Sequence, residues 1–507
     1  MATPIPSNSA PLTAWSAAAA TGGRVAFVRG EGAVAQGITS DSRAASRGCA
    51  FVALRGERHD GHDLVEAAVR AGAVLVVVER GRAGGAAAMS ADVVEVVDTL
   101  VAWGDLARAH VRAWRRGRDD ARVFAITGSA GKTTTKELCA SLLHAVAPCH
   151  ATNGNLNNRI GVPAVAFGLQ AHHRFAVFEA GMSLAGEIAA LARIVEPDVA
   201  IITNVGSAHA GGVGGTRADV AREKGELFAA LPGSGAAVAC IDDAATMGQL
   251  ARTRARTVRT FGTGDGADYC LVERSGVGVH GARVRVRRRR ELTDASGWLP
   301  LLGEAAAVDL AGALAAAESV VGPLGDDLIA DALRSQRFKR GQAGDPGGHG
   351  GRMQVRHLAD DTLVLDDTYN ANPESVRAAL RTLREIAAIA PARRAVVVFG
   401  EMRELGPGGP DAHASLGDAI ADAGVELALS CGGLAELAVL ASGRRGVAGV
   451  HATDAVDAAS LAVKHVRAGD VVLVKASRSV GAERVVEALV QARGGELDVP
   501  SPPSERR

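Results

Sequence analysis

One segment, VFAITGSAGKTTTKE at residues 123–137, constrains the possible folds of this chain more than any other. A short hydrophobic run typical of a buried strand leads into a glycine-containing turn, and polar residues typical of a helix start follow it. Gly128 and Gly131 allow the backbone to wrap around a phosphate without a Cβ clash, and free N–H groups at a helix start attract anions. The segment therefore predicts a phosphate-binding loop within an α/β sheet.

The residue types of this loop are typical of ATP binding. Lys132 supplies a positive charge to the β and γ phosphates, and Thr133 offers a hydroxyl to Mg²⁺. Only two residues separate Gly128 from Gly131, whereas the loop of common kinases and GTPases has four there. An ordinary strand, turn and helix is the structural alternative. We assign the whole loop to ATP: Gly128, Ser129, Ala130, Gly131, Lys132, Thr133 and Thr134.

The length of the chain predicts several domains, because 507 residues exceed the roughly 250–300 that one core usually holds. Hydrophobic runs alternate with helical stretches, which favours α/β architecture throughout. We expect a small N-terminal α/β domain, a central P-loop domain with a doubly wound, mostly parallel sheet, and a C-terminal Rossmann-like α/β domain. The predicted boundaries are 1–118, 119–335 and 336–507, with a linker at 336–352 and a disordered tail from about 498.

Charge argues against nucleic acid and membrane partners. Acidic and basic residues number 56 each, so the chain has no net basic footprint. The segment RVRVRRRR at 283–290 has the charge of a nucleic-acid patch but lacks interleaved aromatic residues, which favours a solvated strand face. It lies in residues 268–300, whose alternating pattern predicts an antiparallel addition to the central sheet. No apolar run reaches the about 18 residues of a membrane span. We expect a cytoplasmic monomer.

Cysteine and lysine usage give two further indications. The six cysteines are scattered without CxxC spacing, which is typical of reduced thiols rather than of a metal cluster. Of the 56 basic residues only six are lysines, so each lysine is a candidate for a position that requires an amine. They are Lys132, Lys136, Lys224, Lys339, Lys464 and Lys475.

Several further motifs occur in a fixed order along the chain. They are TSDSR (39–43), FVALRGERHDGH (51–62), GSAGKTT (128–134), NGNLNNRIGVP (153–163), FEAGMSLAGEI (178–188), TNVGSAHAGGVG (203–214), AREKGELF (221–228), DDTYNANPESV (366–376), FGEMRELG (399–406) and VKASRS (474–479). In this order they resemble the Mur ligases over almost the whole chain, and DDTYNANP resembles one branch of that family.

The resemblance implies an ATP-dependent peptide ligase of peptidoglycan precursor synthesis. Its substrates would be UDP-N-acetylmuramoyl-tripeptide and D-alanyl-D-alanine, and its cofactors ATP and Mg²⁺. ATP would phosphorylate the terminal carboxylate of the peptide, and the amine of the dipeptide would then attack the acyl phosphate. Such a reaction needs positioning and charge neutralisation more than covalent help from the protein.

The resemblance also implies a metal site and a catalytic set. Glu179 ends a buried-type strand at the edge where ligands bind in open α/β sheets, and a carboxylate there suits Mg²⁺. The metal ligands would be Thr133, Glu179, His209 and Lys224, the last as a carbamate; the catalytic residues would be Lys132, Glu179, His209, Lys224 and Asn157. The structural alternatives are a helix-start acid for Glu179, a hydrogen-bonded core residue for His209, and a solvated helix charge for Lys224.

The remaining implied site residues contact the substrates. Arg352 would reach the ATP phosphates and Asp366 the ribose, while Ser42 and Arg43 would meet the uridine diphosphate. Substrate contacts are further implied for Asn158, Tyr369, Asn370, Asn372, Lys475, Ser477 and Arg478, the last three at the carboxylate of the dipeptide. Asparagines in NGNLNN are alternatively simple turn formers.

The chain departs from the family pattern at a few positions. Ala305 and Ala306 stand where the family carries a His-Asn pair near the adenine, so we expect altered base contacts. Ala130 replaces a frequent asparagine, and Ala476 replaces a glycine. Three alternatives therefore remain open: another amide ligase such as a folylpolyglutamate or cyanophycin synthetase, a P-loop kinase, and a catalytically impaired scaffold.

Overall fold

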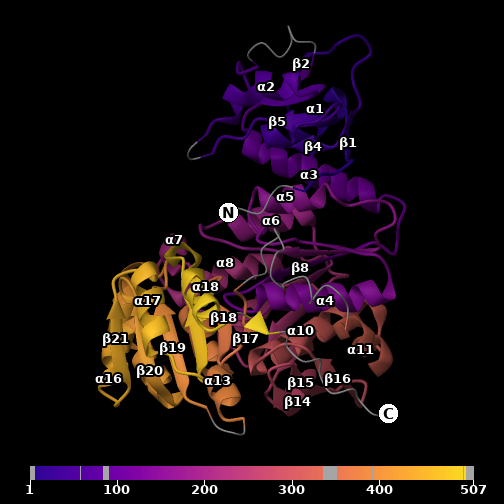
Figure 1. Ribbon diagram of the computed structural model, residues 1–507. Coiled ribbons are helices and arrows are strands. Elements are labelled where there is room, and N and C mark those ends of the chain that lie inside the picture. Colours follow the sequence, from indigo (N-terminus) through magenta and orange to yellow (C-terminus); the bar gives the residue numbers. More distant parts are fainter. Residues whose placement is uncertain are drawn as a thin grey trace.

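The computed structural model describes residues 6–56, 59–83, 91–334, 351–389, 393–494 and 496–497. Three larger β-sheets, each flanked by helices, follow one another along the chain. In Figure 1 the N-terminal sheet lies above the central one, and the C-terminal sheet lies beside the central one. The predicted α/β fold class is confirmed. The expected tail from 498, and the expected linker apart from Gly351 and Arg352, lie outside the described residues.

The N-terminal sheet has five strands in the order β2-β7-β6-β5-β4, and only β2 runs antiparallel to its neighbour. Its strands are β2 (Arg24–Phe27), β4 (Ile38–Thr39), β5 (Ala50–Val52), β6 (Leu75–Glu79) and β7 (Asp92–Val96). The short strands β1 (Pro11–Leu12) and β3 (Ala35–Gln36) pair beside it. Its helices are α1 (Ala14–Thr21) and α2 (Val65–Arg70). The expected small N-terminal α/β unit is thus present.

Helix α3 (Thr99–Arg115) joins this unit to the central one. Asp98 caps its start by accepting a hydrogen bond from the Val101 N–H at 2.9 Å. The helix packs on α1 at one side and on α5 (Gly161–Ala166) and α6 (Glu187–Val195) at the other. Gly104 allows that close approach, because a Cβ there would lie 2.9 Å from Ile194 Cδ1. One hydrophobic core therefore runs from the N-terminal sheet to one face of the central sheet.

The central sheet has nine strands in the order β16-β15-β14-β13-β12-β11-β8-β10-β9. They are β8 (Arg122–Thr127), β9 (Cys149–Ala151), β10 (Phe175–Glu179), β11 (Val199–Ile202), β12 (Ala236–Cys240), β13 (Thr257–Gly262), β14 (Tyr269–Gly278), β15 (Gly281–Arg288) and β16 (Thr293–Leu299). Strands β8 to β14 pair in parallel, whereas β15 and β16 are antiparallel. Both the mostly parallel sheet and its antiparallel addition were predicted.

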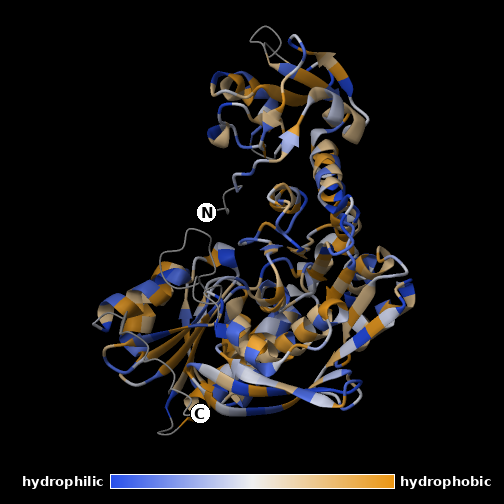
Figure 2. Ribbon diagram, turned by 90° about the vertical axis from the view of Figure 1, so that its right-hand side faces the viewer, coloured by the Kyte–Doolittle hydropathy of each residue, from blue (hydrophilic) through white to orange (hydrophobic). Residues whose placement is uncertain are grey.

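Helices cover both faces of this sheet, because alternate residues of each strand point to opposite sides. In β8, Val123 and Ala125 belong to one core, and Phe124 and Ile126 to the other. The helices are α4 (Lys132–Val146), α5, α6, α7 (Ala210–Val213), α8 (Arg217–Ala229), α9 (Ala244–Gly248), α10 (Glu304–Val321) and α11 (Asp326–Arg334). Figure 2 shows hydrophobic residues concentrated on such strands and on the inward sides of the helices.

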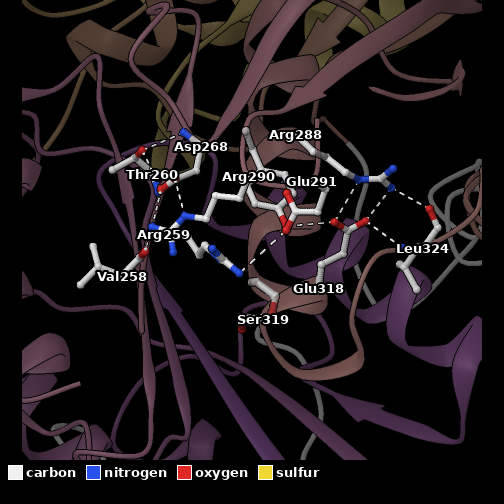
Figure 3. Close-up of polar contacts among 12 residues, drawn as sticks. Val258, Arg259, Thr260, Asp268, Arg288, Arg290, Glu291, Glu318, Ser319 and Leu324 are labelled. Atoms are coloured by element: carbon white, nitrogen blue, oxygen red, sulfur yellow. Dashed lines mark hydrogen bonds and ion pairs between the residues drawn. The ribbon is translucent and has the colours of Figure 1, made fainter. Parts of the chain in front are cut away.

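The arginine-rich segment in β15 is only partly the solvated face that its sequence indicates. Arg285 is half-exposed and pairs with Glu273, but Arg288 is 4% exposed. Figure 3 shows the Arg288 guanidinium against Glu318, with Nη2 to Oε1 at 2.7 Å and Nε to Oε2 at 3.0 Å. Tyr269 also donates to Glu318 Oε2, at 2.9 Å. The expectation was wrong for Arg288, because strand alternation turns every second side chain inward, where α10 supplies a carboxylate.

The C-terminal sheet has seven strands in the order β21-β20-β19-β22-β18-β17-β23. They are β17 (Gln354–Leu358), β18 (Leu363–Asp367), β19 (Ala395–Gly400), β20 (Val425–Cys431), β21 (Ala448–Ala452), β22 (Val471–Lys475) and β23 (Glu496–Leu497). Only the pairs β17–β18 and β17–β23 are antiparallel. The helices are α13 (Pro373–Ala387), α14 (Gly409–Ala414), α15 (Leu416–Asp422), α16 (Ala435–Gly443), α17 (Ala455–His465) and α18 (Glu483–Ala492). This is the expected Rossmann-like arrangement.

Two whole-chain features complete the fold. All six cysteines are buried thiols. Within the described ranges, no helix combines the length and apolar character needed to cross a membrane.

We expect Glu318→Ala to lower the free energy of unfolding by about 3–5 kcal/mol, because it leaves the Arg288 guanidinium buried without its carboxylate. The matched control is Glu273→Ala, which breaks the half-exposed pair with Arg285 and should cost less than about 1 kcal/mol. Urea titration of both variants measures the difference. Equal losses would contradict the structural importance of the buried pair.

Candidate functional site

The phosphate loop between β8 and α4 has a backbone that only glycine permits at two places. Gly131 has φ +80° and directly precedes α4, so the free N–H groups of the helix start face the loop. A Cβ at Gly128 would lie 1.8 Å from Thr203 Oγ1. The loop is therefore closely packed against the segment that follows β11.

Asn204, in that segment, holds the crest of the loop in place. Its Oδ1 accepts from the Ala130 N–H at 2.9 Å and its Nδ2 donates to the Ala130 carbonyl at 3.1 Å. The Asn204 carbonyl accepts from the Ser129 N–H at 3.0 Å. These contacts use the backbone of residue 130, so the alanine found there in place of the family asparagine leaves them intact.

Charges at the loop favour an anionic ligand. Lys132 donates from Nζ to the Gly128 carbonyl at 2.6 Å, across the loop. The nearest acid on the other side is Asp309 of α10, whose Oδ1 would lie 2.5 Å from a Cβ at Gly131. Burial raises the pKa of the Asp309 carboxyl well above its ordinary value, which favours the uncharged form of this acid. The loop thus keeps a positive local field.

A buried carboxylate lies beside the loop, at the carboxyl end of β10. Glu179 is 1% exposed; its Oε2 accepts from the Thr133 hydroxyl at 2.8 Å and its Oε1 from Asn157 Nδ2 at 2.8 Å. Its N–H donates to Thr152 Oγ1 at 3.0 Å. The predicted residues Thr133, Asn157 and Glu179 are therefore in contact, and Glu179 is not a helix-start acid.

Cations keep this carboxylate ionised. Burial alone would raise the pKa of Glu179. Lys136, Arg352 and Lys132, together with the hydrogen bond from Asn157, outweigh burial and hold that pKa below its ordinary value. Lys136 is fully buried and donates from Nζ to the Thr152 carbonyl at 2.7 Å. The site is therefore an ionised acid surrounded by positive charge.

Lys224 of α8 lies on the underside of the same loop. Its side chain is 1% exposed and its Nζ donates to the Gly128 carbonyl at 3.0 Å. Burial lowers its pKa well below the ordinary value, and the charge of Lys132 lowers it further. A solvated helix charge is therefore excluded.

His209 faces the C-terminal unit. It directly precedes α7 and has φ +61°. Its Nδ1 is in contact with Oε2 of Glu404, a residue with φ +65°. Two non-glycine residues in the left-handed region mark this contact as a strained one. His209 does not contact Glu179 or Thr133, so the predicted metal ligands are not all assembled around one point.

A cavity of about 310 Å³ opens beside this pair, between the central and C-terminal units. It is lined by Ala208, His209, Asn370, Ala371, Asn372, Arg403, Glu404, Ser477, Arg478 and Ser479. Two guanidiniums and one carboxylate thus face a small polar space. The predicted residues Asn370, Asn372, Ser477 and Arg478 meet here.

The start of α13 contacts the phosphate loop directly. Asn372 caps this helix by accepting from the Ser375 N–H at 2.9 Å, and its Nδ2 donates to the Ser129 carbonyl at 3.2 Å. Two residues further on, Glu374 Oε1 accepts from the Ser207 N–H at 3.2 Å. The loop DDTYNANPE therefore joins the cavity to the nucleotide-binding elements.

Some predicted residues have internal partners instead. Lys475 is 2% exposed and donates to Asp367 Oδ2 at 2.5 Å and to the Asn370 carbonyl at 2.9 Å, so it braces the loop after β18. Asp366 is buried and accepts from the Thr368 hydroxyl at 2.7 Å; burial raises its pKa. Neither side chain points at the cavity.

Other predicted residues lie apart from this cluster. Asn158 Oδ1 accepts from the Gly161 and Ile160 N–H groups, which is the turn-forming alternative. Ser42 and Arg43 belong to a single 3₁₀ turn of the N-terminal unit, where the exposed Arg43 pairs with Asp41 at 2.8 Å.

Sequence reasoning did not assign roles to four residues that shape the site. Lys136 had a signal, because it is one of only six lysines. Asn204 and Glu404 belong to the motifs TNVGSAHAGGVG and FGEMRELG, but the neighbouring sequence does not indicate that their side chains contact distant segments. Asp309 lies in an alanine-rich helix, and nothing in the sequence around it indicated a role in the site. Ala305 and Ala306 begin that helix, where Gly303 packs against Thr382 of α13.

Comparison with known proteins matches three stretches of the chain to Mur ligase models. Residues 34–110 match the "Mur ligase family, catalytic domain", residues 126–317 the "Mur ligase middle domain", and residues 351–478 the "Mur ligase, glutamate ligase domain". The ranges leave out only short connecting segments and the ends.

Individual relatives are similar over nearly their full length. The UDP-N-acetylmuramoyl-tripeptide–D-alanyl-D-alanine ligase of Escherichia coli is 34% identical over 89% of this chain and 93% of its own length. That of Mycobacterium tuberculosis is 33% identical over 94% and 98%. A crystal structure of MurF from Acinetobacter baumannii superposes with TM-score 0.81 at 30% identity, covering 94% of this chain and 98% of its own. MurF from Thermotoga maritima in complex with ADP gives 0.72 at 27%, covering 89% and 96%.

We expect Gly131→Ala to weaken nucleotide binding by at least about tenfold, because the new Cβ meets both a left-handed backbone and the Asp309 carboxyl. Gly186→Ala is the matched control: it has φ +85° but nothing within 4 Å of the added Cβ. Calorimetric titration with nucleotide, alongside thermal unfolding, separates the two effects. Equal affinities in the two variants would show that the packing around the loop is irrelevant to binding.

Proposed function

This chain belongs to the Mur ligase family, and we infer that it is an ATP-dependent ligase that adds D-alanyl-D-alanine to UDP-N-acetylmuramoyl-tripeptide in peptidoglycan synthesis. The observation that carries this function is the phosphate loop with Glu179 beside it, joined through Asn372 to a charged cavity on the C-terminal unit. A nucleotide site next to a second small polar site is what coupling ATP cleavage to amide formation requires.

The phosphates of ATP bind at the loop. Gly128 to Thr134 supply the cradle and the start of α4, and Lys132 neutralises charge on the β and γ phosphates. Arg352 adds a second cation near Lys132 and Glu179, as its effect on the pKa values of both groups indicates. The related MurF from Thermotoga maritima was solved with ADP, which supports this assignment.

The reaction proceeds in two steps. The γ-phosphoryl group of ATP passes to the terminal carboxylate of the tripeptide, which forms an acyl phosphate and ADP. The amine of the dipeptide then attacks the acyl carbon, the C–O bond to phosphate breaks, and the amine proton is lost as the amide forms. The positive field of Lys132 and Arg352 stabilises negative charge in both steps.

The residues at the loop fit a magnesium ion. In the described part of the chain, no three His, Cys, Asp or Glu side chains cluster as a complete metal cage. Mg²⁺ rarely uses such a cage; it is held by one or two carboxylates together with substrate phosphates and water. Glu179 and the Thr133 hydroxyl, in contact at 2.8 Å, would hold it beside the phosphates. When bound, the ion neutralises phosphate charge. We keep His209 as a further candidate ligand.

Lys224 is the candidate for carbamylation. Its amine is buried, and burial lowers its pKa well below the ordinary value, which favours the neutral, nucleophilic amine. The amine nitrogen would attack the carbon of CO₂ and release one proton, which places an anionic carboxylate-like group next to the Gly128 carbonyl and Lys132. Such a group would be a third oxygen ligand for the metal or a partner for Lys132. Arginine cannot form it.

The dipeptide binds in the cavity of about 310 Å³. Arg403 and Arg478 suit its carboxylate, since guanidinium matches carboxylate geometry. Ser477 adds a hydroxyl, whereas Lys475 acts through the loop that it braces. The UDP-sugar binds at the N-terminal unit, with Ser42 and Arg43 as candidates for the diphosphate.

Domain boundaries at 1–118, 119–335 and 336–507 stay a proposal, supported by the three matched stretches, each of which falls within one of them. A cytoplasmic location fits nucleotide-linked substrates, and the monomer stays a prediction.

We expect phosphate release from ATP only when both UDP-muramoyl-tripeptide and D-alanyl-D-alanine are present, with a UDP-pentapeptide detected by mass spectrometry. Glu179→Gln should lower kcat by at least about a hundredfold, because the metal site loses its charge while the packing is kept. The control is Glu273→Gln on strand β14, which pairs with the antiparallel addition to the central sheet and should retain full turnover. A folded protein that releases no phosphate with both substrates would move the assignment to another amide substrate or to a scaffold.

We expect a carbamate carbon signal in NMR spectra of the protein incubated with ¹³C-bicarbonate, and its loss in Lys224→Arg. Turnover of Lys224→Arg should fall by at least about tenfold. Lys464→Arg, an exposed lysine on α17, serves as the control and should keep both signal and turnover. A signal that persists in Lys224→Arg would assign the carbamate elsewhere.

A further inference from the structure

Tyr369 belongs to the loop that follows β18 and directly precedes Asn370, which lines the dipeptide cavity. Its N–H donates to the Gly351 carbonyl at 2.8 Å, which ties this loop to the segment that precedes β17. The approach is close: a Cβ at Gly351 would lie 2.5 Å from Thr368 Oγ1 and 2.9 Å from the Tyr369 nitrogen. The residue after Gly351 is thereby placed directly over the tyrosine ring.

That residue is Arg352, and its guanidinium stacks on the ring. The Cζ of Arg352 lies 3.7 Å from the ring centroid of Tyr369, which is van der Waals contact with the ring. Its Nε is buried and has no hydrogen-bond partner in the described part of the chain. The aromatic ring is therefore the group that fixes the direction of this guanidinium.

The stacked pair lies beside the phosphate loop. Three residues after Tyr369, Asn372 Nδ2 donates to the Ser129 carbonyl at 3.2 Å, so the loop that holds the ring contacts the phosphate loop directly. A second guanidinium, that of Arg478 in the dipeptide cavity, has its Cζ 6.0 Å from the same ring centroid. The ring is thus in contact with the Arg352 guanidinium and lies at the outer limit of cation–π range from that of Arg478.

We propose that Tyr369 is a positioning residue, whose ring holds the Arg352 guanidinium at the ATP phosphates rather than contacting substrate through its hydroxyl. The proposal rests on the proposed function only for the identity of the nucleotide. The motif predicted that Tyr369 binds substrate. In the role proposed here, the face of its ring, and not the phenol oxygen, positions the Arg352 guanidinium. The coupling to Arg478 would make the ring sensitive to the dipeptide as well.

Four variants of the full-length protein test this: Tyr369→Phe, Tyr369→Leu, Arg352→Met and the double variant Tyr369→Leu/Arg352→Met. Affinities for a non-hydrolysable ATP analogue and for ADP are measured by calorimetry with Mg²⁺, so the readout is independent of turnover. If the chain were not a ligase for the proposed substrates, the turnover assay would be silent while these affinities would still report on Arg352.

Tyr369→Leu should weaken binding of the ATP analogue about tenfold and of ADP distinctly less, because the misplaced cation serves the terminal phosphate. Tyr369→Phe keeps the ring and should restore binding to nearly that of the unmodified protein. The double variant should bind no more weakly than Arg352→Met alone, since the ring acts only through the guanidinium. In turnover, Tyr369→Leu should raise KM for ATP, and Tyr369→Phe should not.

Two outcomes would overturn the proposal. If Tyr369→Phe loses as much affinity as Tyr369→Leu, the hydroxyl contacts the ligand. If the losses of the single variants add in the double variant, ring and guanidinium act independently.

Two further variants test whether a change in nucleotide preference merely reflects a general loss of structure. Arg352→Lys leaves the tyrosine in place and keeps the charge but not the planar stack, so it should still lose most of the preference for the ATP analogue over ADP; full preference would contradict the stacking role. Tyr269→Phe, at the other tyrosine of the chain, should lower the unfolding temperature and leave that preference unchanged, because the Tyr269 hydroxyl donates to Glu318 of the buried Arg288–Glu318 pair and not to a residue of the site.

Discussion

The buried carboxylate of Glu179 is the constraint that the rest of the site must satisfy. An ionised acid away from water is stable only with charged or hydrogen-bonding partners around it. Here Thr133 and Asn157 each donate to one of its oxygens, and Lys132, Lys136 and Arg352 supply the compensating charge. These partners come from the phosphate loop, from α4, from the turn after β9 and from the C-terminal unit. A single acid therefore ties together elements that lie far apart in the sequence.

The same requirement explains why the central and C-terminal units meet where they do. Asn372 donates to the Ser129 carbonyl at the crest of the loop, and Arg352 reaches the charges around Glu179. Both residues follow or precede strands of the C-terminal sheet, so the contacts depend on how the two sheets are set side by side (Figure 1). Residues of both units thus meet at the phosphate loop, which suits an enzyme that must bring ATP and an amine substrate to one carboxylate.

Local patterns allowed much of the site to be predicted. The strand, glycine turn and helix start around Lys132 have a direct sequence signature, and the position of Glu179 follows from the end of a hydrophobic run. The buried lysines Lys136 and Lys224 stand out because arginine replaces lysine almost everywhere else. The prediction of a solvated strand face was wrong for Arg288, because strand alternation turned this side chain inward to the buried Glu318. The substrate contact of Lys475 stays a prediction; in the structure its amine donates to Asp367.

The sequence by itself determined the α/β class, the order of the three units and the family, because these depend on periodicity and on motifs that act over a few residues. Only the tertiary structure decided which distant groups pair. Asn204 hydrogen-bonds to the loop at Ala130, Asp309 packs against Gly131, His209 contacts Glu404, and Arg352 stacks on the Tyr369 ring. Each pairing depends on the distance between two elements and on their relative orientation. Both are set only when the sheets and helices pack together around a buried core.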